Sequence, residues 1–176
     1  TGFPTEVNVP PPPRAEAVKA LFSDDEIKEF EKYGSRSFTA GIPWYNAPRR
    51  PGADQNPGGN TVWAPGWWGG TLMKIDIYSY KVTQYLIPSP EIDGAYDIKV
   101  DKDHMAWVSF QNGDMIARFD PKAEKWTEFR LPTLNFDQHA IGLLDDTDGH
   151  TKITIPSFGT GKVMYFELRT KQEQDA

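Results

Sequence analysis

The stretch from Tyr96 to Pro132 decides the fold and reads YDIKVDKDHMAWVSFQNGDMIARFDPKAEKWTEFRLP. Apolar and polar residues alternate over short runs in it, and turn sequences such as Asn112-Gly113-Asp114 separate these runs. Alternation with a period of two is typical of half-buried antiparallel strands, and Gly, Asn and Asp favour turns. The stretch therefore predicts a small antiparallel sheet of three or four short strands.

The same pattern occurs in the segment that precedes this stretch. Three landmarks recur at a constant separation of 44 residues: Trp63 and Trp107, Asp76 and Asp120, and Pro88 and Pro132. A third, more divergent copy has apolar runs at 153–155 and 163–167. A period of this length with four strands in each unit is typical of a β-propeller blade. We therefore predict an all-β fold with about three blades of a larger β-propeller ring; a solenoid and a sandwich are the alternatives.

The remaining segments divide the chain around these blades. Residues 1–34 predict a Pro-rich arm and one short helix over 24–33, because Ser23 and Glu26 have the spacing of a capping box. Residues 35–60 predict a long loop that leads into the first blade. The blades themselves are expected over 61–170, followed by a tail at 171–176.

The composition excludes several classes of function. None of the 176 residues is cysteine, which excludes disulfide bonds, thiolate nucleophiles and covalent c-type haem attachment in this chain. The net charge of −6 argues against a nucleic-acid partner. No apolar run approaches the roughly 20 residues that span a bilayer, so we expect no membrane span.

The stretch quoted above also resembles a known family, the streptogramin (virginiamycin B) lyase-like β-propellers. The resemblance rests on YDIKVD at 96–101, on Trp107 and on IARFDPKAEKWTEFRLP at 116–132, and it covers about 49–170. It implies a seven-bladed ring of which this chain is the C-terminal part. The sequence APRRPGAD at 47–54 is similar to a segment of large secreted bacterial proteins in which such a propeller accompanies a cytochrome c domain.

Alignment of the inner strands of the three units predicts a site. It places three residues at equivalent positions at the mouth of the inner strand, with two neighbours beside them: Arg49, Tyr96 and His139, with Arg50 and Asp97. Central channels of propellers are lined from such positions. Because guanidinium groups donate in pairs and histidine changes charge near neutral pH, we expect an anionic or polar ligand there. The alternative role for these residues is to cap strands and tie neighbouring blades together.

Two adjacent tryptophans, Trp67 and Trp68, stand between glycines. Neighbouring side chains on a strand point to opposite faces, so one indole is expected in the core and the other exposed for a ligand or partner. Packing at the edge of a blade is the alternative.

The resemblance implies a lyase that uses a histidine general base and a divalent metal near carboxylates. His139 matches the position of the family's histidine, whereas Gly66, Phe110 and Ser157 stand where the family has its carboxylate. We therefore assign no metal and no cofactor to this chain. The Asp-rich turn at 145–149 is similar to half of a calcium loop, but it lacks the distal Glu.

Three blades are too few to close a ring, and they would leave two end sheets exposed. We therefore predict another chain or segment that completes the propeller. Three functions stay open. The first is a scaffold and channel-lining part of a periplasmic or secreted, oxidoreductase-associated complex, with a haem on a cytochrome c partner and a signal peptide already removed or upstream. The second is a lyase with His139 as general base on a cyclic ester. The third is an interaction scaffold that binds a neighbouring subunit through the arm and helix.

Overall fold

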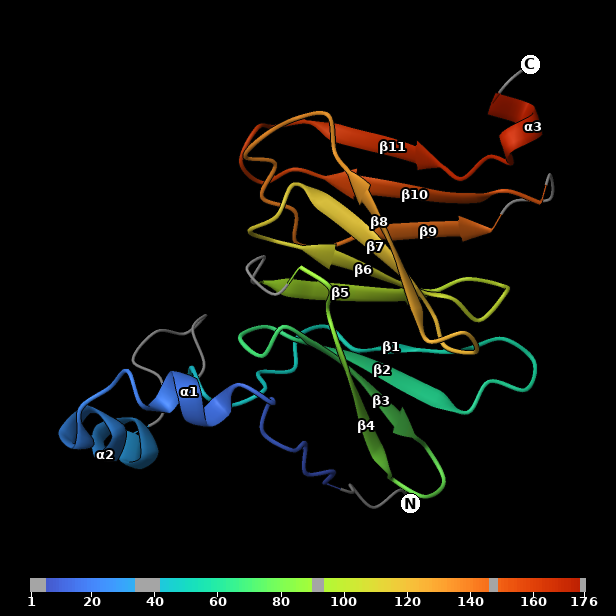
Figure 1. The fold of residues 1–176 in the computed structure, drawn as a ribbon. Coiled ribbons are helices and arrows are strands. Elements are labelled where there is room, and N and C mark those ends of the chain that lie inside the picture. Colours follow the sequence, from blue (N-terminus) through green and yellow to red (C-terminus); the bar gives the residue numbers. More distant parts are fainter. Residues whose placement is uncertain (1–5, 34–41, 90–93, 146–148, 175–176) are drawn as a thin grey trace, which may run out of the picture.

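Three antiparallel sheets stacked side by side make up most of the chain (Figure 1). The computed structural model describes residues 6–33, 42–89, 94–145 and 149–174. The first blade contains β1 (Gly52–Ala53), β2 (Thr61–Gly66), β3 (Thr71–Asp76) and β4 (Val82–Leu86), in that order. The second blade repeats this order with β5 (Ala95–Val100), β6 (Ala106–Phe110), β7 (Met115–Asp120) and β8 (Lys125–Arg130). The third blade is formed, within the described residues, by β9 (Gly142–Asp145), β10 (Thr151–Pro156) and β11 (Val163–Glu167).

This arrangement confirms the predicted fold class, an all-β protein built from propeller blades. The innermost strands are neighbours, because β1 contacts β5 and β5 contacts β9. From these strands the sheets extend outward to β4, β8 and β11 (Figure 1). A groove of about 300 Å³ runs along the inner strands and is lined by residues that include Gly52, Ile98 and Leu143. The radial order therefore has an inner, channel side and an outer rim.

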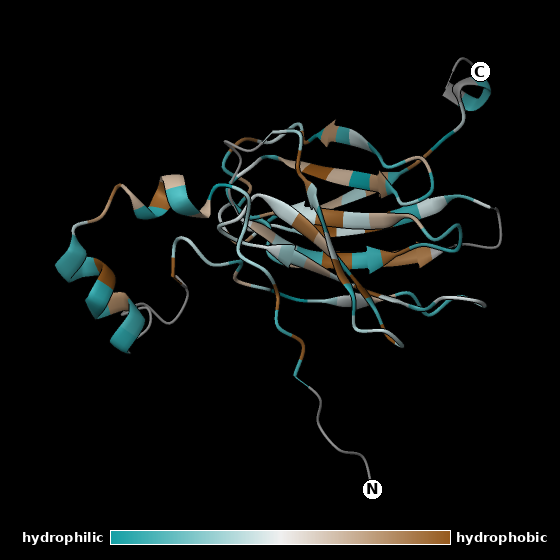
Figure 2. Cartoon of the chain, turned by 60° about the horizontal axis from the view of Figure 1, so that its bottom comes forward, coloured by the Kyte–Doolittle hydropathy of each residue, from teal (hydrophilic) through white to brown (hydrophobic). Residues whose placement is uncertain are grey.

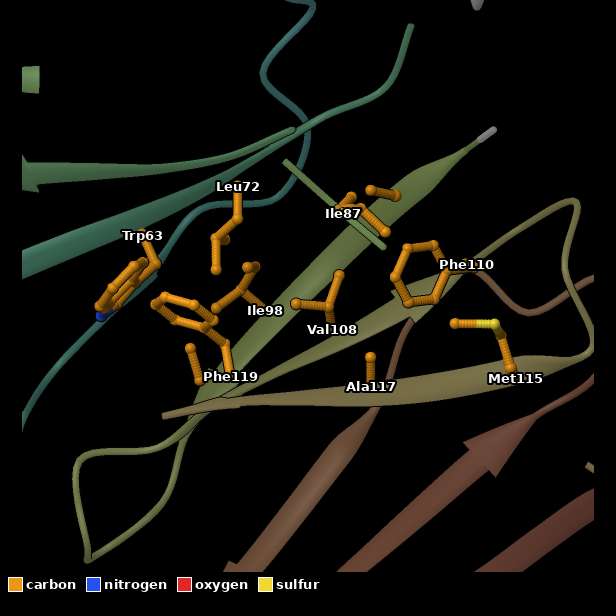
Figure 3. Close-up of a cluster of buried hydrophobic side chains, with 11 residues drawn as sticks. Trp63, Leu72, Ile87, Ile98, Val108, Phe110, Met115, Ala117 and Phe119 are labelled. Atoms are coloured by element: carbon orange, nitrogen blue, oxygen red, sulfur yellow. The ribbon is translucent and has the colours of Figure 1, made fainter. Parts of the chain in front are cut away.

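The first and second blades are joined by an apolar core that lies between their facing sheets (Figure 3). Trp63 of β2 packs against Phe119 of β7, with ring centroids 5.7 Å apart. Tyr85 of β4 contacts the same ring at 4.6 Å. Aromatic pairs of this kind stabilise by about 0.5–1.5 kcal/mol each beyond the burial of apolar area. The landmark tryptophan of the repeat is thus the residue that connects one blade to the next.

The second and third blades repeat this contact. Trp107 of β6 packs against Phe166 of β11, again with centroids 5.7 Å apart. Its indole Nε1 donates a 2.7 Å hydrogen bond to Asp101, so the buried polar atom is satisfied. Phe129 of β8 completes the aromatic group at 5.0 Å from Phe166. The same pair of positions, a Trp in one blade and a Phe in the next, therefore forms both interfaces within the chain.

Two helices lie beside the first blade, α1 (Ala15–Lys19) and α2 (Asp24–Tyr33) (Figure 1). The bounds of α2 match the helix expected over 24–33, and the expected capping box is present, since the Ser23 amide and hydroxyl both donate to Glu26. Figure 2 shows α2 as mostly hydrophilic. Its apolar side packs through Phe30 on the buried Trp44, with ring centroids 5.4 Å apart.

The Pro-rich arm, residues 6–14, lies on the side of the first blade that faces away from the second blade. Gln84 of β4 donates to the carbonyl oxygens of both Pro10 and Pro11. Gln84 pairs with Met73, and Met73 pairs with Ala64, so these three side chains share one face of the sheet. Met73 is fully buried and Ala64 is 2% exposed. We call this side the first outward face; the arm binds it at Gln84.

No helix among the described residues is long and apolar enough to cross a membrane. The third short helix, α3 (Lys171–Gln174), follows the last strand of the third blade. His150, which precedes β10, contacts Glu173 of α3 at 2.8 Å. The two terminal segments are therefore attached to opposite end blades.

Candidate functional site

The three residues aligned from the sequence occupy equivalent places in the three blades. In each blade, the residue that precedes the aligned one pairs with a residue at the end of the second strand. The pairs are Pro48 with Gly66, Ala95 with Phe110, and Gln138 with Ser157. Arg49, Tyr96 and His139 therefore follow the same structural position three times. They enter the inner strands at one end of the blades, as the alignment predicted.

Four rings from the three blades form a continuous row at this end, which we call the aromatic row: Trp67, Tyr96, His139 and Phe158. Trp67 meets Tyr96 edge to face at 5.4 Å. Tyr96 stacks on His139 at 4.7 Å with an interplanar angle of 17°. His139 stacks on Phe158 at 5.4 Å and 11°. Since Phe158 is 80% exposed, the row runs from the buried Trp67 to solvent.

Two guanidinium groups lie over the aromatic row. The Arg49 group is 4.5 Å from the centre of the Trp67 ring, and the Arg50 group is 5.5 Å from that of Tyr96. Both are cation–π distances, at which the attraction contributes about 0.5–2 kcal/mol. Within the described part of the chain, neither arginine forms an ion pair with a carboxylate. The site therefore presents two cations whose charge no described acidic side chain neutralises.

His139 also has a carboxylate beside it. Its Nε2 lies 3.3 Å from Asp137 Oδ1, which is an ion-pair distance, although the two groups are not aligned as a hydrogen bond. Asp137 also lines a polar pocket of about 480 Å³, together with Gln111, Asn112, Asp114, Asn135 and Gly159. Amide and carboxylate groups dominate this lining. The aromatic row thus adjoins a pocket that offers both donors and acceptors.

Asp97, the fifth residue expected at the site, is hydrogen-bonded within the protein. The side chain is buried and accepts hydrogen bonds from the backbone N–H of Ile98 and of Ile141, at 3.0 and 2.9 Å. Lys99 donates to both of its oxygens at 2.9 Å. Because Ile141 belongs to the third blade, this carboxylate ties the second and third blades together. Both oxygens of Asp97 are thus bound by groups of the protein itself.

The two tryptophans differ in their surroundings. Trp67 is 7% exposed and belongs to the aromatic row, whereas Trp68 is half-buried and its ring meets Trp67 at 6.3 Å. Both lie in the turn after β2 rather than on the strand, so the rule of alternating faces does not decide their directions. Trp67 joins the site, and Trp68 contacts Trp67.

Sequence reasoning missed two members of the site, Phe158 and Asp137. Phe158 follows Ser157, as Trp67 follows Gly66, so the alignment of these two residues contained the signal for a second ring at this end. Asp137 has a left-handed backbone with φ of 48°, in a loop where Asn135 has φ of 52°. Loops of this kind carry no periodic signal, and only the folded chain brings Asp137 to His139.

No group of three or more His, Cys, Asp or Glu side chains within the described residues is arranged to hold a metal ion. Residues 146–148 of the Asp-rich turn lie outside the described residues. His104 instead bonds Asp54 through its Nδ1 at 2.6 Å. Partial burial alone would raise the pKa of Asp54, but hydrogen bonds from His104 and Asn56 outweigh this effect and hold the pKa below its usual value.

Fold and site together define a three-blade portion of a β-propeller with an aromatic and cationic cluster at one end of its blades. No family model matches the sequence, and no curated protein matches it. Among solved structures, the chain is similar to a streptogramin B lyase, with 17% identity over 76% of this chain and 44% of that one, at a TM-score of 0.54. It is also similar to a catalytically inactive virginiamycin B lyase from Staphylococcus aureus with quinupristin, with 20% identity, 72% and 43% coverage and a TM-score of 0.51.

A further likeness is to the hydrazine synthase of Kuenenia stuttgartiensis, with 16% identity over 79% of this chain and 39% of that one, at a TM-score of 0.49. The two lyases confirm a streptogramin lyase-like propeller fold, which is the fold that the repeat and the family resemblance predicted. The chain spans less than half of the length of either lyase.

Proposed function

We propose that this chain contributes three blades to a larger propeller and that the end carrying the aromatic row binds an anionic ligand with a planar group. The observation that supports this function most directly is the pair of guanidinium groups of Arg49 and Arg50. They stack on Trp67 and Tyr96, and no carboxylate among the described residues pairs with them. An anion stacked on the row would receive paired donors from arginine and retain contact with the rings.

Two features of the surroundings favour a bound ligand over a purely structural cluster. The row ends on the exposed Phe158, so a planar group has a surface on which to stack. The polar pocket next to Asp137 adds hydrogen-bonding groups within the same end of the blades. Ligand sites of proteins combine apolar surface with a few convergent polar groups in this way.

Benzoate and its uncharged analogue benzamide test the proposal. We expect benzoate to shift the NMR signals of the Trp67 indole and of His139, and to bind at least roughly tenfold more tightly than benzamide, since a hydrogen bond to a charged group contributes about 1.5–3 kcal/mol. Arg49→Gln combined with Arg50→Gln should abolish the difference between the two probes.

Arg118→Gln provides the matched control. Arg118 lies over Trp107 at 5.7 Å, so it is also an arginine stacked on a tryptophan, but it lies on β7 at the interface of the second and third blades. This variant should bind benzoate as the unmodified chain does. Equal binding of benzoate and benzamide, or equal losses in the Arg118 and Arg49/Arg50 variants, would contradict an anion site.

A lyase that uses His139 as general base is the second candidate. Its supporting observation is the Asp137 carboxylate, 3.3 Å from His139 Nε2, because a carboxylate at this place orients the imidazole and stabilises its charged form. The probe is quinupristin, the compound present with one of the similar lyases. This function predicts turnover that His139→Ala abolishes and Asp137→Asn reduces, with the fold unchanged by circular dichroism.

We further propose that the complete assembly is periplasmic or secreted and works beside a cytochrome c. The support for this is the similarity of residues 47–54 to secreted proteins that combine such a propeller with a cytochrome domain. Purification of the assembly from its source cells should then yield a c-type haem absorbance in proportion to this chain. An assembly free of haem would rule out the cytochrome partner and leave the ligand site untouched.

A further inference from the structure

The third blade has a face that turns away from the second blade, and it is exposed. Ile153 and Ile155 of β10 point into the core shared with the second blade, so the residues that alternate with them point outward. Tyr165 is 58% exposed, Val163 74% and Leu144 60%. We call this side the third outward face.

The register of the sheets identifies what is missing from this face. Trp63 stands three residues before Gly66, and Trp107 three residues before Phe110, the two residues that bridge to the site strands. The same count from Ser157 leads to Thr154. Thr154 therefore occupies the position of the tryptophan that joins each of the other blades to its neighbour.

A cavity lies at the position of the absent indole. It has a volume of about 150 Å³, and the residues around it are Gly142, Leu143, Leu144, Lys152, Thr154 and Tyr165. Gly142 and Tyr165 are the cross-strand partners of Thr154 on either side. An apolar cavity of that size accommodates a benzene-sized ring.

We propose that a fourth propeller blade, different in sequence from these three, docks on the third outward face and inserts an aromatic side chain into this cavity. The inference rests on the proposed function, in which the chain is part of a larger ring. The expected aromatic side chain is inferred from the two internal interfaces. There Trp63 meets Phe119 and Trp107 meets Phe166, with the ring centroids 5.7 Å apart in both. In the third blade, threonine replaces the tryptophan and leaves a cavity. An aromatic side chain at the Phe position of the fourth blade would fill this cavity.

A second copy of this chain is a poorer occupant. In a head-to-tail dimer, the first outward face of one copy would meet the third outward face of the other. The residue of the first blade at the Phe119 position is Ile75, which pairs with Val62 and carries no ring. The arm that Gln84 holds also lies across that face. The geometry therefore favours a blade of another sequence.

Photo-cross-linking of the complete protein in its source cells tests this inference. With p-benzoylphenylalanine in place of Tyr165, we expect a cross-link to a peptide that has alternating strand patterning and an aromatic residue, and that does not occur in these 176 residues. The same probe in place of Tyr78, which is 78% exposed in the turn after β3, should give no such product.

Thr154→Asp supplies the second readout, since it puts a short charged side chain, which cannot swing away, at the cavity. We expect the cross-linked product to fall by about tenfold or more, because an aromatic side chain docked there would bury an unpaired carboxylate. Thr127→Asp, at an exposed threonine of β8, is the matched control and should leave the yield unchanged.

Cross-links to a second copy of this chain, detected by mixing isotopically labelled and unlabelled protein, would overturn the inference. An unchanged yield with Thr154→Asp would also overturn it. A stable assembly that gives no cross-link from position 165 would overturn the proposal that a blade docks on the third outward face. The proposal of a larger propeller would not be affected by that result. A complete protein that proves to be a 19.9 kDa monomer overturns both.

Discussion

The two outward faces of this blade stack differ in how they are completed. On the first outward face, Met73 and Ala64 are buried, and Gln84 binds the Pro-rich arm. On the third outward face, Leu144, Val163 and Tyr165 are exposed at the surface. Both faces belong to sheets of the same repeat, so the difference lies in what covers them.

A propeller blade is completed by its neighbour, and a short extended segment can replace part of that neighbour. The arm has no hydrogen-bonding N–H at its prolines, so it cannot add a strand to the sheet. It instead accepts hydrogen bonds from Asn46 and Gln84 through its carbonyl oxygens. No described segment plays this part on the third blade.

The largest expected effect concerns a complete interface. Trp107→Ala should lower the free energy of unfolding by about 3–5 kcal/mol, because Trp107 is fully buried between two blades. Thr154→Ala, at the equivalent position on the third outward face, should change it by less than about 0.5 kcal/mol. Urea unfolding of both variants measures the difference. Equal losses would contradict the assignment of Thr154 to a face that none of the three described blades covers.

Removal of the arm is expected to have an intermediate effect. A chain lacking residues 1–13 loses the carbonyl oxygens that Gln84 and Asn46 bind, each bond contributing about 1 kcal/mol. Oxidation of Met73 by hydrogen peroxide should then accelerate by roughly tenfold or more, as local opening exposes the thioether. Met115, fully buried in the core between the first two blades, is the internal control and should react at its former rate. An unchanged rate at Met73 would show that the arm does not cover the first outward face.

The smallest expected effect concerns the C-terminal helix on the third blade. Hydrogen bonds from the hydroxyl and N–H of Thr170, and a contact with His150, lower the pKa of Glu173 from 4.5 to about 2. Because the folded pKa is depressed, the carboxylate stabilises the helix start above about pH 4.5, and this contribution is lost as the pH falls toward 2.

Amide hydrogen exchange at Thr170 measures this effect. Protection should decline between about pH 4.5 and pH 2 in the natural chain, after correction for the intrinsic exchange rate. Glu173→Gln should show low protection without that pH dependence, and Glu167→Gln serves as the variant at a neighbouring carboxylate. A Thr170 profile that Glu173→Gln leaves unaltered would contradict the capping role.

The blades were predictable because their signals are periodic. Apolar and polar residues alternate over 117–120 in β7, and the 44-residue spacing of Trp63 and Trp107 repeats a structural position. The helix over 24–33 was predictable from its cap. By contrast, β1 has only two residues, Gly52 and Ala53, within the region expected to be a loop, and it is held in place by pairing with β2. So short a strand shows no alternation in the sequence.

The site was predictable only in part. Alignment of the inner strands brought Arg49, Tyr96 and His139 to one end, since equivalent positions in a repeat fold to equivalent places. It did not show that the Asp97 carboxylate is buried and hydrogen-bonded, because one of its donors is the backbone N–H of Ile141 in the next blade. Whether a polar residue faces a ligand or a neighbouring blade is decided by tertiary contacts that have no local signature.

Native mass spectrometry of the complete protein purified from its source cells tests whether these three blades belong to a larger propeller. We expect a particle heavier than 19.9 kDa that contains this chain together with further blade sequence of a different composition. A stable monomer of 19.9 kDa at micromolar concentration, with the third outward face still exposed, would contradict it.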